Sequence, residues 1–363
     1  MTECTSTPLA SSPAFGPAVE SALLGAAAGD AAGYPVELLP AAEITSENLP
    51  LSNASELIFS DDTQLLCYTL DALTEVLEWN NRGVAADELA CLWLAYLRWV
   101  RGMGYELLEN APFSLDREID SAESLHDRQG PGQATLEALL SGEMQSVSKN
   151  MNPDALGSGA LVRAAALGFL PVATEQTVVL LAARSAALTH GHPEALASAV
   201  ACALTVRELL AQVTGAASGS LRDAVTIARE LCEHIASMDS IPGSATLSIE
   251  ALDNALSDAS AAELAERAGN DWRATTVLSL AIAFALEAEK SMDSMPAERV
   301  LVQALNSAAS VDSDSDSTAA LTGLFLCVRY PQLLESVPES VLTRLRGAED
   351  IRAVAQRYLA QLV

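Results

Sequence analysis

Two stretches of the sequence combine neighbouring Asp residues with hydroxyl side chains immediately before an apolar segment. The first is "SDDT" at residues 60–63, and the second is "DSDST" at residues 314–318. Four carboxylates that are brought together repel one another and take up protons unless cations neutralise them. Hard divalent cations prefer carboxylate and hydroxyl oxygens as ligands. If the fold joins the two stretches, they predict a pair of Mg²⁺ or Mn²⁺ ions that orients sugar or phosphate oxygens.

Helix capping is the simpler interpretation of the same residues. Ser60 can cap a helix that begins at residue 61, and acidic residues in a first turn favour the positive end of the helix dipole. For "SDDT" alone this interpretation is sufficient. The second acidic stretch, again placed before an apolar helix, is what favours a shared metal site.

Other metal patterns fail when they are tested against the sequence. A calcium EF-hand loop beginning at residue 312 would need Gly and Glu where Ser317 and Gly323 stand. A prenyl-transfer DDxxD motif would need Asp in place of Leu65. Zinc is poorly served, because His190 and His192 have no Cys cluster near them. A site for hard cations therefore remains.

Apolar residues at spacings of three and four predict the helices that must position these acids. Within residues 63–79, Leu66, Leu70, Leu73 and Leu77 form one stripe. No strand alternation or internal repeat is visible, and aromatic residues make up only 4% of a chain that is 50% hydrophobic. The sequence therefore predicts an all-α protein. Similar stripes occur at residues 86–101, 176–189, 194–212, 220–236, 274–289, 318–329 and 350–362.

The segments between these stripes define the expected domain organisation. Residues 1–17 are rich in Ser, Pro and Thr and are expected to be a disordered leader. None of the later loops resembles an interdomain linker, so residues 18–363 are expected to form one compact helical domain. Loops are predicted at residues 104–132, 141–159, 237–250 and 308–317.

Charge and cysteine usage narrow the class of partner. Forty-eight acidic against 20 basic residues give a formal net charge of −28, which argues against an extended nucleic-acid surface or binding to an anionic membrane. Six cysteines form no CxxC pair, and five lie in apolar helical segments, as expected of buried thiols in a reducing compartment. With no basic-then-apolar leader and no uncharged apolar run of about 18 residues, a cytoplasmic location is expected.

Several further residues have both a binding and a structural interpretation. Gly157-Ser158-Gly159 could offer backbone N–H groups to a phosphate, or could be a simple loop. His190 could bind a ligand or have a structural role in the core, while His192 before Pro193 suits a helix cap. Arg163 lies in an apolar stretch and is expected to pair with a buried carboxylate. Close helix packing is expected at Gly25, Gly29 and Gly33.

Five motifs, in their order along the chain, resemble the ADP-ribosylglycohydrolase family. They are "LLGAAAGDAAGYPVE" (23–37), "SDDT" (60–63), "GSGALVRAAALGFL" (157–170), "LTHGHPEA" (188–195) and "DSDSTAALTG" (314–323). The resemblance spans about residues 18–360. It implies a single orthogonal multi-helix bundle whose central cleft binds two divalent cations (Mg²⁺ or Mn²⁺) and ADP-ribose.

The resemblance also implies roles for individual residues. It implies hydrolysis at the anomeric carbon of the distal ribose, which releases a protein side chain or a small acceptor through an oxocarbenium-like transition state. Glu37 or Asp62 would be the base that activates water. The implied metal ligands are Ser60, Asp61, Asp62, Asp314, Asp316 and Ser317. The implied ADP-ribose contacts are Gly157, Ser158, Gly159 and His190, with Gly132 and Thr135 on the diphosphate side.

The sequence departs from the family pattern close to this site. Asp312-Ser313 stands where the family usually has Gly-Gly, Ser158 replaces an Asn, and Val162 replaces a Met. Two rival interpretations follow: a catalytically silent ADP-ribose binder or crystallin-like relative, and a structural protein whose acids only cap helices. Because every expected metal-binding acid is present, the enzyme is favoured. Residues 104–130 are the candidate rim that selects the acceptor.

Overall fold

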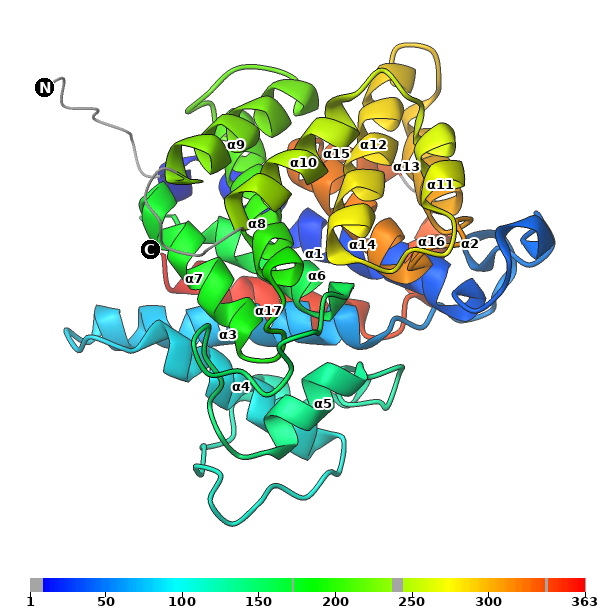
Figure 1. Cartoon of the computed structure of the whole chain (residues 1–363). Helices are drawn as coiled ribbons and strands as arrows, with labels where there is room; N and C mark the ends of the chain where they lie inside the picture. The colour runs from blue at the N-terminus through cyan, green and yellow to red at the C-terminus, as the bar shows by residue number, and fades with distance from the viewer. Residues whose placement is uncertain (1–8, 172, 237–243, 337–338, 363) are drawn as a thin grey trace, which may run out of the picture.

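The structure, a computed structural model, describes residues 9–171, 173–236, 244–336 and 339–362. Figure 1 shows these residues as helices joined by turns and loops. The described residues contain no β-strand beyond two isolated bridges. The predicted all-α class is therefore confirmed.

Two glycine-lined helices, α1 (Phe15–Gly33) and α14 (Ser315–Arg329), pack against each other near the centre of the molecule (Figure 1). A Cβ atom at Gly29 would lie 2.0 Å from the carbonyl oxygen of Ala319, and one at Gly33 would lie 2.4 Å from the Cα atom of Asp316. Real side chains do not fit such gaps, so the two backbones touch directly. The close packing that was expected of the glycine stripe is confirmed, and it places the end of α1 beside the acidic start of α14.

The helix that follows "SDDT" is α3 (Asp61–Asn81), which packs against α4 (Glu88–Gly102) and α17 (Ala348–Ala360). The predicted apolar stripe faces the interior, since Leu66, Leu70 and Leu73 are fully buried. In Figure 1, α17 runs beside α3, while α4 and α5 (Gln133–Leu140) lie below it with the long loops.

Helix α8 (Pro193–Val213) lies inside the fold and packs against helices from both halves of the chain. Pro193 occupies the first turn, and His192 Nδ1 accepts a hydrogen bond from the Glu194 N–H at 3.2 Å, so the predicted cap is confirmed. Length and composition alone would let α8 cross a membrane, but 78% of its apolar window is buried within this fold. Its α-helical partners are α1, α6 (Leu161–Ala164), α7 (Glu175–Ala187), α9 (Leu221–Ala236), α10 (Ser244–Leu256), α12 (Ala274–Ser291) and α14.

Short helices complete the fold. The remaining α-helices are α2 (Pro50–Asn53), α11 (Ala261–Ala268), α13 (Ala297–Ala308), α15 (Gln332–Ser336) and α16 (Glu339–Arg344). The 3-10 helices are η1 (Leu9–Ser11), η2 (Tyr34–Val36), η3 (Ala41–Glu43), η4 (Glu118–Ser121), η5 (Glu123–Leu125), η6 (Ser158–Ala160) and η7 (Ala165–Phe169).

The structure corrects three expected boundaries. The loop predicted at 237–250 contains the first residues of α10, and the loop predicted at 308–317 contains the first turn of α14. Residues 1–8 of the expected leader lie outside the described residues, but η1 and the start of α1 fall within residues 9–17. Phe15 explains this difference, because its ring is only 1% exposed and joins the core.

The cysteines follow the expected pattern where they are described. Cys67, Cys91, Cys202, Cys232 and Cys327 are free and buried, while Cys4 lies outside the described residues. Burial raises the pKa of each of these five thiols above its ordinary value. A protonated, buried thiol behaves as a small apolar side chain, so these residues belong to the core.

Candidate active site

The start of α3 presents two buried acids. Ser60 is the N-cap, and its hydroxyl accepts a hydrogen bond from the Asp62 N–H at 3.2 Å. Asp61 and Asp62 follow in the first turn, where exposed N–H groups and the helix dipole favour negative charge. Capping is therefore part of what these residues do. It does not account for the burial of both carboxylates.

The start of α14 has the same chemistry. Asp314 is the N-cap, and its Oδ1 atom accepts a hydrogen bond from the Ser317 N–H at 3.3 Å. The same N–H lies 2.7 Å from Asp316 Oδ1. Asp314, Asp316 and Ser317 are all buried. The stretch predicted as a loop is thus a capped helix start that directs carboxylates inward.

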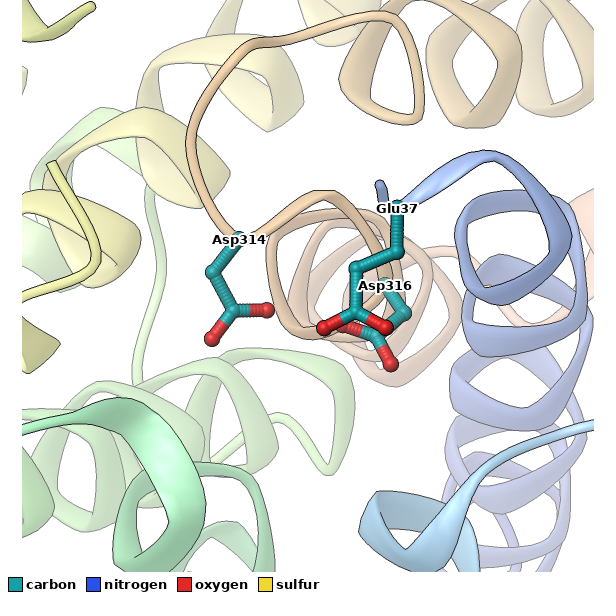
Figure 2. A group of neighbouring side chains, drawn as sticks. All are labelled: Glu37, Asp314 and Asp316. Carbon is teal, nitrogen blue, oxygen red and sulfur yellow. The ribbon is translucent and has the colours of Figure 1, made fainter. Parts of the chain in front are cut away.

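The two helix starts meet, as the metal-site hypothesis requires. The Ser317 hydroxyl of α14 donates a 2.5 Å hydrogen bond to Asp62 Oδ2 of α3. Glu37, which follows η2, joins them from the end of α1: Glu37, Asp314 and Asp316 each offer an oxygen, and these oxygens lie within 4.8 Å of one another. Figure 2 shows the Glu37 carboxylate directed toward Asp316. The fold therefore brings all five predicted acids into one region.

Burial and mutual repulsion favour the protonated forms of Glu37, Asp61, Asp62 and Asp316. Burial, with the charges of Asp314 and Asp30 added, raises the pKa of Glu37 to about 7. Burial raises the pKa of Asp61 to about 8, and the hydrogen bond from Gly132 acts against that rise. The pKa values of Asp62 and Asp316 are also raised well above the ordinary value, first by burial and then by neighbouring carboxylates.

The protein itself supplies no cation to this cluster. Among the ion pairs of the described residues, none includes Glu37, Asp61, Asp62, Asp314 or Asp316. A buried group of hard oxygen donors without a protein counter-charge fits a divalent cation. The residues present therefore suit the metal that the sequence predicted.

Arg163 is buried nearby but does not neutralise the acids. Its guanidinium donates hydrogen bonds to the Ser185 carbonyl at 3.1 Å and the Thr189 hydroxyl at 2.7 Å, and it stacks over the Tyr96 ring at 4.7 Å. Asp61 interacts with it only beyond ion-pair distance. The expectation that Arg163 pairs with a buried carboxylate is wrong, because carbonyl oxygens and an aromatic face satisfy its charge instead.

The predicted ADP-ribose contacts gather beside the acids. A Cβ atom at Gly159 would lie 3.2 Å from His190 Cε1 and 3.5 Å from the Thr135 hydroxyl oxygen, so the three residues adjoin one another. His190 Nδ1 lies 2.7 Å from the Thr189 hydroxyl. Burial and the nearby Arg163 charge lower the pKa of His190 to about 3, which keeps its ring neutral. The Thr135 hydroxyl is buried without a hydrogen-bond partner.

Two binding segments are bonded directly to the acids. The Ser158 hydroxyl donates a hydrogen bond to Asp314 Oδ2, which links the Gly-Ser-Gly segment to the start of α14. The Gly132 N–H donates to Asp61 Oδ2 at 3.3 Å, which links the start of α5 to that of α3. Each predicted substrate segment therefore contacts a predicted metal ligand.

Asp30 is a site residue that the sequence interpretation missed. It is fully buried on α1, and its carboxylate accepts hydrogen bonds from the Ser60 N–H (2.7 Å), the Thr63 N–H (3.1 Å) and the Thr63 hydroxyl (2.6 Å). These bonds fix the start of α3 against α1. Burial raises the pKa of Asp30 to about 6. Its position in the Ala- and Gly-rich segment 21–33 was the available signal, because an unpaired acid is rare in such a helix.

Comparisons with known proteins show the fold and the family of this chain. Among solved structures, the chain is similar to one described as "ADP-ribosylglycohydrolase-related protein complex", with a TM-score of 0.59, 21% sequence identity, and coverage of 96% of this chain and 99% of that chain. That likeness shows a shared fold. A search among curated proteins found no match. The family model described as ADP-ribosylglycohydrolase matches residues 12–363. The chain therefore belongs to the ADP-ribosylglycohydrolase family, whose members hydrolyse bonds to ADP-ribose.

Proposed function

We propose that this protein is a divalent-metal-dependent hydrolase that cleaves the glycosidic bond between ADP-ribose and a protein side chain or small acceptor. The observation that carries the proposal is the convergence of two buried acidic helix starts whose carboxylates form no ion pair among the described residues. Asp61, Asp62, Asp314 and Asp316 would bind two Mg²⁺ or Mn²⁺ ions, together with the hydroxyls of Ser60 and Ser317. When bound, these ions would supply positive charge that orients the ribose hydroxyls.

Glu37 is the favoured general base. Its carboxylate is only partly buried, so water can reach it, and its pKa of about 7 suits proton transfer near neutral pH. Asp62 is buried and accepts the Ser317 hydrogen bond, which suits a ligand better. Glu37 would take a proton from a water molecule while the oxygen of that water bonds to the anomeric carbon. The glycosidic bond breaks, and the acceptor leaves with the bonding electrons and gains a proton.

ADP-ribose would bind across the segments that surround the acids. Gly157, Ser158, Gly159 and His190 would contact it, because backbone N–H groups at a helix start and a neutral imidazole can bind its oxygens despite the acidic surface. The Thr135 hydroxyl is buried without a hydrogen-bond partner and adjoins Gly159 and Gly132, which supports a diphosphate contact there. The acceptor would meet residues 104–130, where Leu108, Phe113 and Leu115 are exposed. We propose that the enzyme acts in the cytoplasm and binds neither nucleic acid nor a membrane.

A catalytically silent ADP-ribose binder is the second candidate. The hydrogen bond between Ser158 and Asp314 favours it, because it engages an oxygen that a metal ligand would need. This candidate predicts ADP-ribose binding without turnover.

Thermal melting followed by a turnover assay tests the proposal. Metal-stripped protein is melted with Mg²⁺, Mn²⁺ or Ca²⁺, each with and without ADP-ribose, because a ligand that prefers the folded state raises Tm. We expect a rise with Mg²⁺ or Mn²⁺, a further rise with ADP-ribose, and release of ADP-ribose from peptides modified at arginine or serine. Binding without release would favour the silent relative. No response of folded protein to either ligand would overturn the proposal.

A further inference from the structure

The segment that carries Glu37 is poorly anchored by burial. Val36 is buried and so is Pro50, but every residue from 37 to 49 is partly or fully exposed. Leu38, the neighbour of the proposed base, is 86% exposed. Apolar packing therefore does not fix this stretch, and its position depends on individual hydrogen bonds.

One hydrogen bond connects this stretch to a distant part of the fold. The Ala41 N–H, at the start of η3, donates to Asp312 Oδ1 at 2.7 Å. The other hydrogen bonds described for residues 37–49 stay within residues 34–53, as in the bonds from Leu39 N–H to the Val36 carbonyl and from Glu43 N–H to the Pro40 carbonyl. Asp312 is therefore the described side chain that ties the Glu37 segment to the rest of the molecule.

Asp312 is well placed to act as a fixed point. It stands two residues before Asp314, between Val311 and Ser313, which are both buried. The Ser313 hydroxyl donates a 2.6 Å hydrogen bond to the Asp271 carbonyl, which fixes the backbone of this turn. The Asp312 side chain itself is exposed. A rigid backbone thus presents an accessible carboxylate to the Ala41 N–H, and charge makes such a bond stronger than one between neutral groups.

We infer that Asp312 is a positioning residue for Glu37, and that its bond to Ala41 holds the Glu37 segment beside the start of α14. The inference rests on the proposed role of Glu37 as general base. The inference explains the acid at position 312, where the family usually has glycine. A glycine has no side chain and could not accept the Ala41 hydrogen bond. The rival role for Asp312 is a fifth metal ligand, and the group of oxygens formed by Glu37, Asp314 and Asp316 does not include it.

Two substitutions separate these roles. Asp312→Ala removes the acceptor of the Ala41 bond, whereas Asp312→Asn keeps an oxygen acceptor and removes the charge. Asp87→Ala is the matched control, because Asp87 is an exposed residue at the start of α4 whose carboxylate accepts a hydrogen bond from the Ala90 N–H at 3.0 Å. This control removes a bond of the same kind far from Glu37 in the sequence.

Amide hydrogen exchange at Ala41 is measured by NMR in the metal-free full chain. In Asp312→Ala, exchange should become roughly five- to tenfold faster, as expected when one charge-assisted hydrogen bond is lost. Asp312→Asn should give a rate between those of the original protein and Asp312→Ala, because it keeps the acceptor without the charge, and Asp87→Ala should leave the rate within about twofold of the original. In turnover assays, Asp312→Ala should lower kcat several-fold and leave KM and Mg²⁺ affinity unchanged. Asp312→Asn should restore most of the turnover.

Unchanged Ala41 exchange in Asp312→Ala would overturn the inference. Loss of Mg²⁺ affinity in both Asp312 variants would also overturn it and would make Asp312 a ligand. The exchange measurement needs neither metal nor substrate. If the original protein shows no turnover but Asp312→Ala shows faster exchange, the bond is established and the failure belongs to the proposed function.

Discussion

Helix α3 carries two buried groups of acids, which differ in whether described arginine side chains pair with them. In its first turn, Asp61 and Asp62 meet the acids of α14, and within the described part of the chain neither forms an ion pair. Further along the same helix, Asp71 Oδ2 accepts hydrogen bonds from Arg98 of α4 and from Arg117, both at 2.8 Å. Asp71 and Arg98 are each only 2% exposed. The two groups of acids on this helix are therefore similarly buried, but arginine side chains pair with the second group and not with the first.

The second cluster extends into an internal network of ion pairs. Arg98 also pairs with Asp120 at 3.1 Å, and Arg117 contacts both carboxylate oxygens of Glu78 at 3.1 Å. The Tyr68 hydroxyl donates to Asp120 at 2.9 Å. These bonds connect α3 to α4 and to the 104–132 loop. A network whose charges are satisfied inside the protein contributes to the fold, whereas acids without a counter-charge indicate a site for an external cation.

Breaking the satisfied cluster should have the largest effect on stability. Arg98→Met leaves Asp71 buried with one of its two arginine partners removed, and we expect it to lower the free energy of unfolding by about 3–5 kcal/mol. Arg101→Met on the same helix is the control, because Arg101 and Asp116 are 36% and 78% exposed and their pair should contribute less than about 1 kcal/mol. Urea unfolding measures both. Equal losses in the two variants would contradict the distinction.

Breaking the uncompensated cluster should affect function instead. Asp316→Ala removes a proposed ligand, and we expect turnover to fall by at least about 100-fold, together with loss of the Mg²⁺-dependent rise in Tm. The metal-free variant should be as stable as the original protein or more stable, because repulsion among the acids is reduced. Steady-state kinetics and melting test this. Retained Mg²⁺ response and turnover would show that Asp316 is not a ligand.

Asp30 is a third case of a buried acid, because hydrogen bonds stabilise its carboxylate and no ion pair of the described residues includes it. Asp30→Asn replaces one acceptor oxygen with an NH₂ group that faces the Thr63 or Ser60 donors. We expect a loss of about 1–3 kcal/mol in the free energy of unfolding. Weaker Mg²⁺ binding should accompany it, since the start of α3 is no longer fixed against α1. Calorimetric titration with Mg²⁺ measures that effect, and unchanged affinity would limit Asp30 to a role in stability.

The pH dependence of metal-free protein gives the smallest expected effect. The folded pKa values of Asp30, Glu37 and Asp61 are raised to about 6, 7 and 8, whereas unfolded carboxyls titrate near pH 4. Between these limits the folded state binds more protons, so its stability falls as pH rises. We expect Tm in EDTA to drop by at least about 2 °C between about pH 5 and about pH 8. Saturating Mg²⁺, which favours the ionised carboxylates, should remove the drop. A flat profile in EDTA would contradict the assigned shifts.

Local patterns in the sequence were sufficient for most of the long helices and for the starts of α3 and α8. The stripe beginning at Leu66 predicted the buried face of α3, and Ser60 predicted its cap. Such signals depend on residues within one or two turns. The helices α10 and α13 were not among the predicted stripes, although Val300, Leu301, Ala304 and Leu305 of α13 are buried at helical spacing.

The contacts between distant residues could not be predicted in the same way. The pairing of Arg117 with Asp71 joins a loop to a helix, and neither neighbourhood identifies the other. A metal site shared by the two acidic stretches was inferred from their residue types, whereas Glu37 and the full ligand set were implied by the resemblance. The bond between Asp312 and Ala41 was also hidden, because an acid in a Ser-rich turn gives no indication of a partner 271 residues away.

The glycine contact between α1 and α14 has a consequence for tolerance to mutation. At Gly33 no side chain separates the end of α1 from the backbone of Asp316. The spacing between these two parts of the site is therefore determined by main-chain atoms, and not by rotamers that differ from one variant to the next. Discrimination between cations by size requires such a constant spacing. Substitutions elsewhere in the core can therefore accumulate over evolutionary time while the spacing of the proposed ligands at this contact stays the same, provided that Gly33 stays glycine.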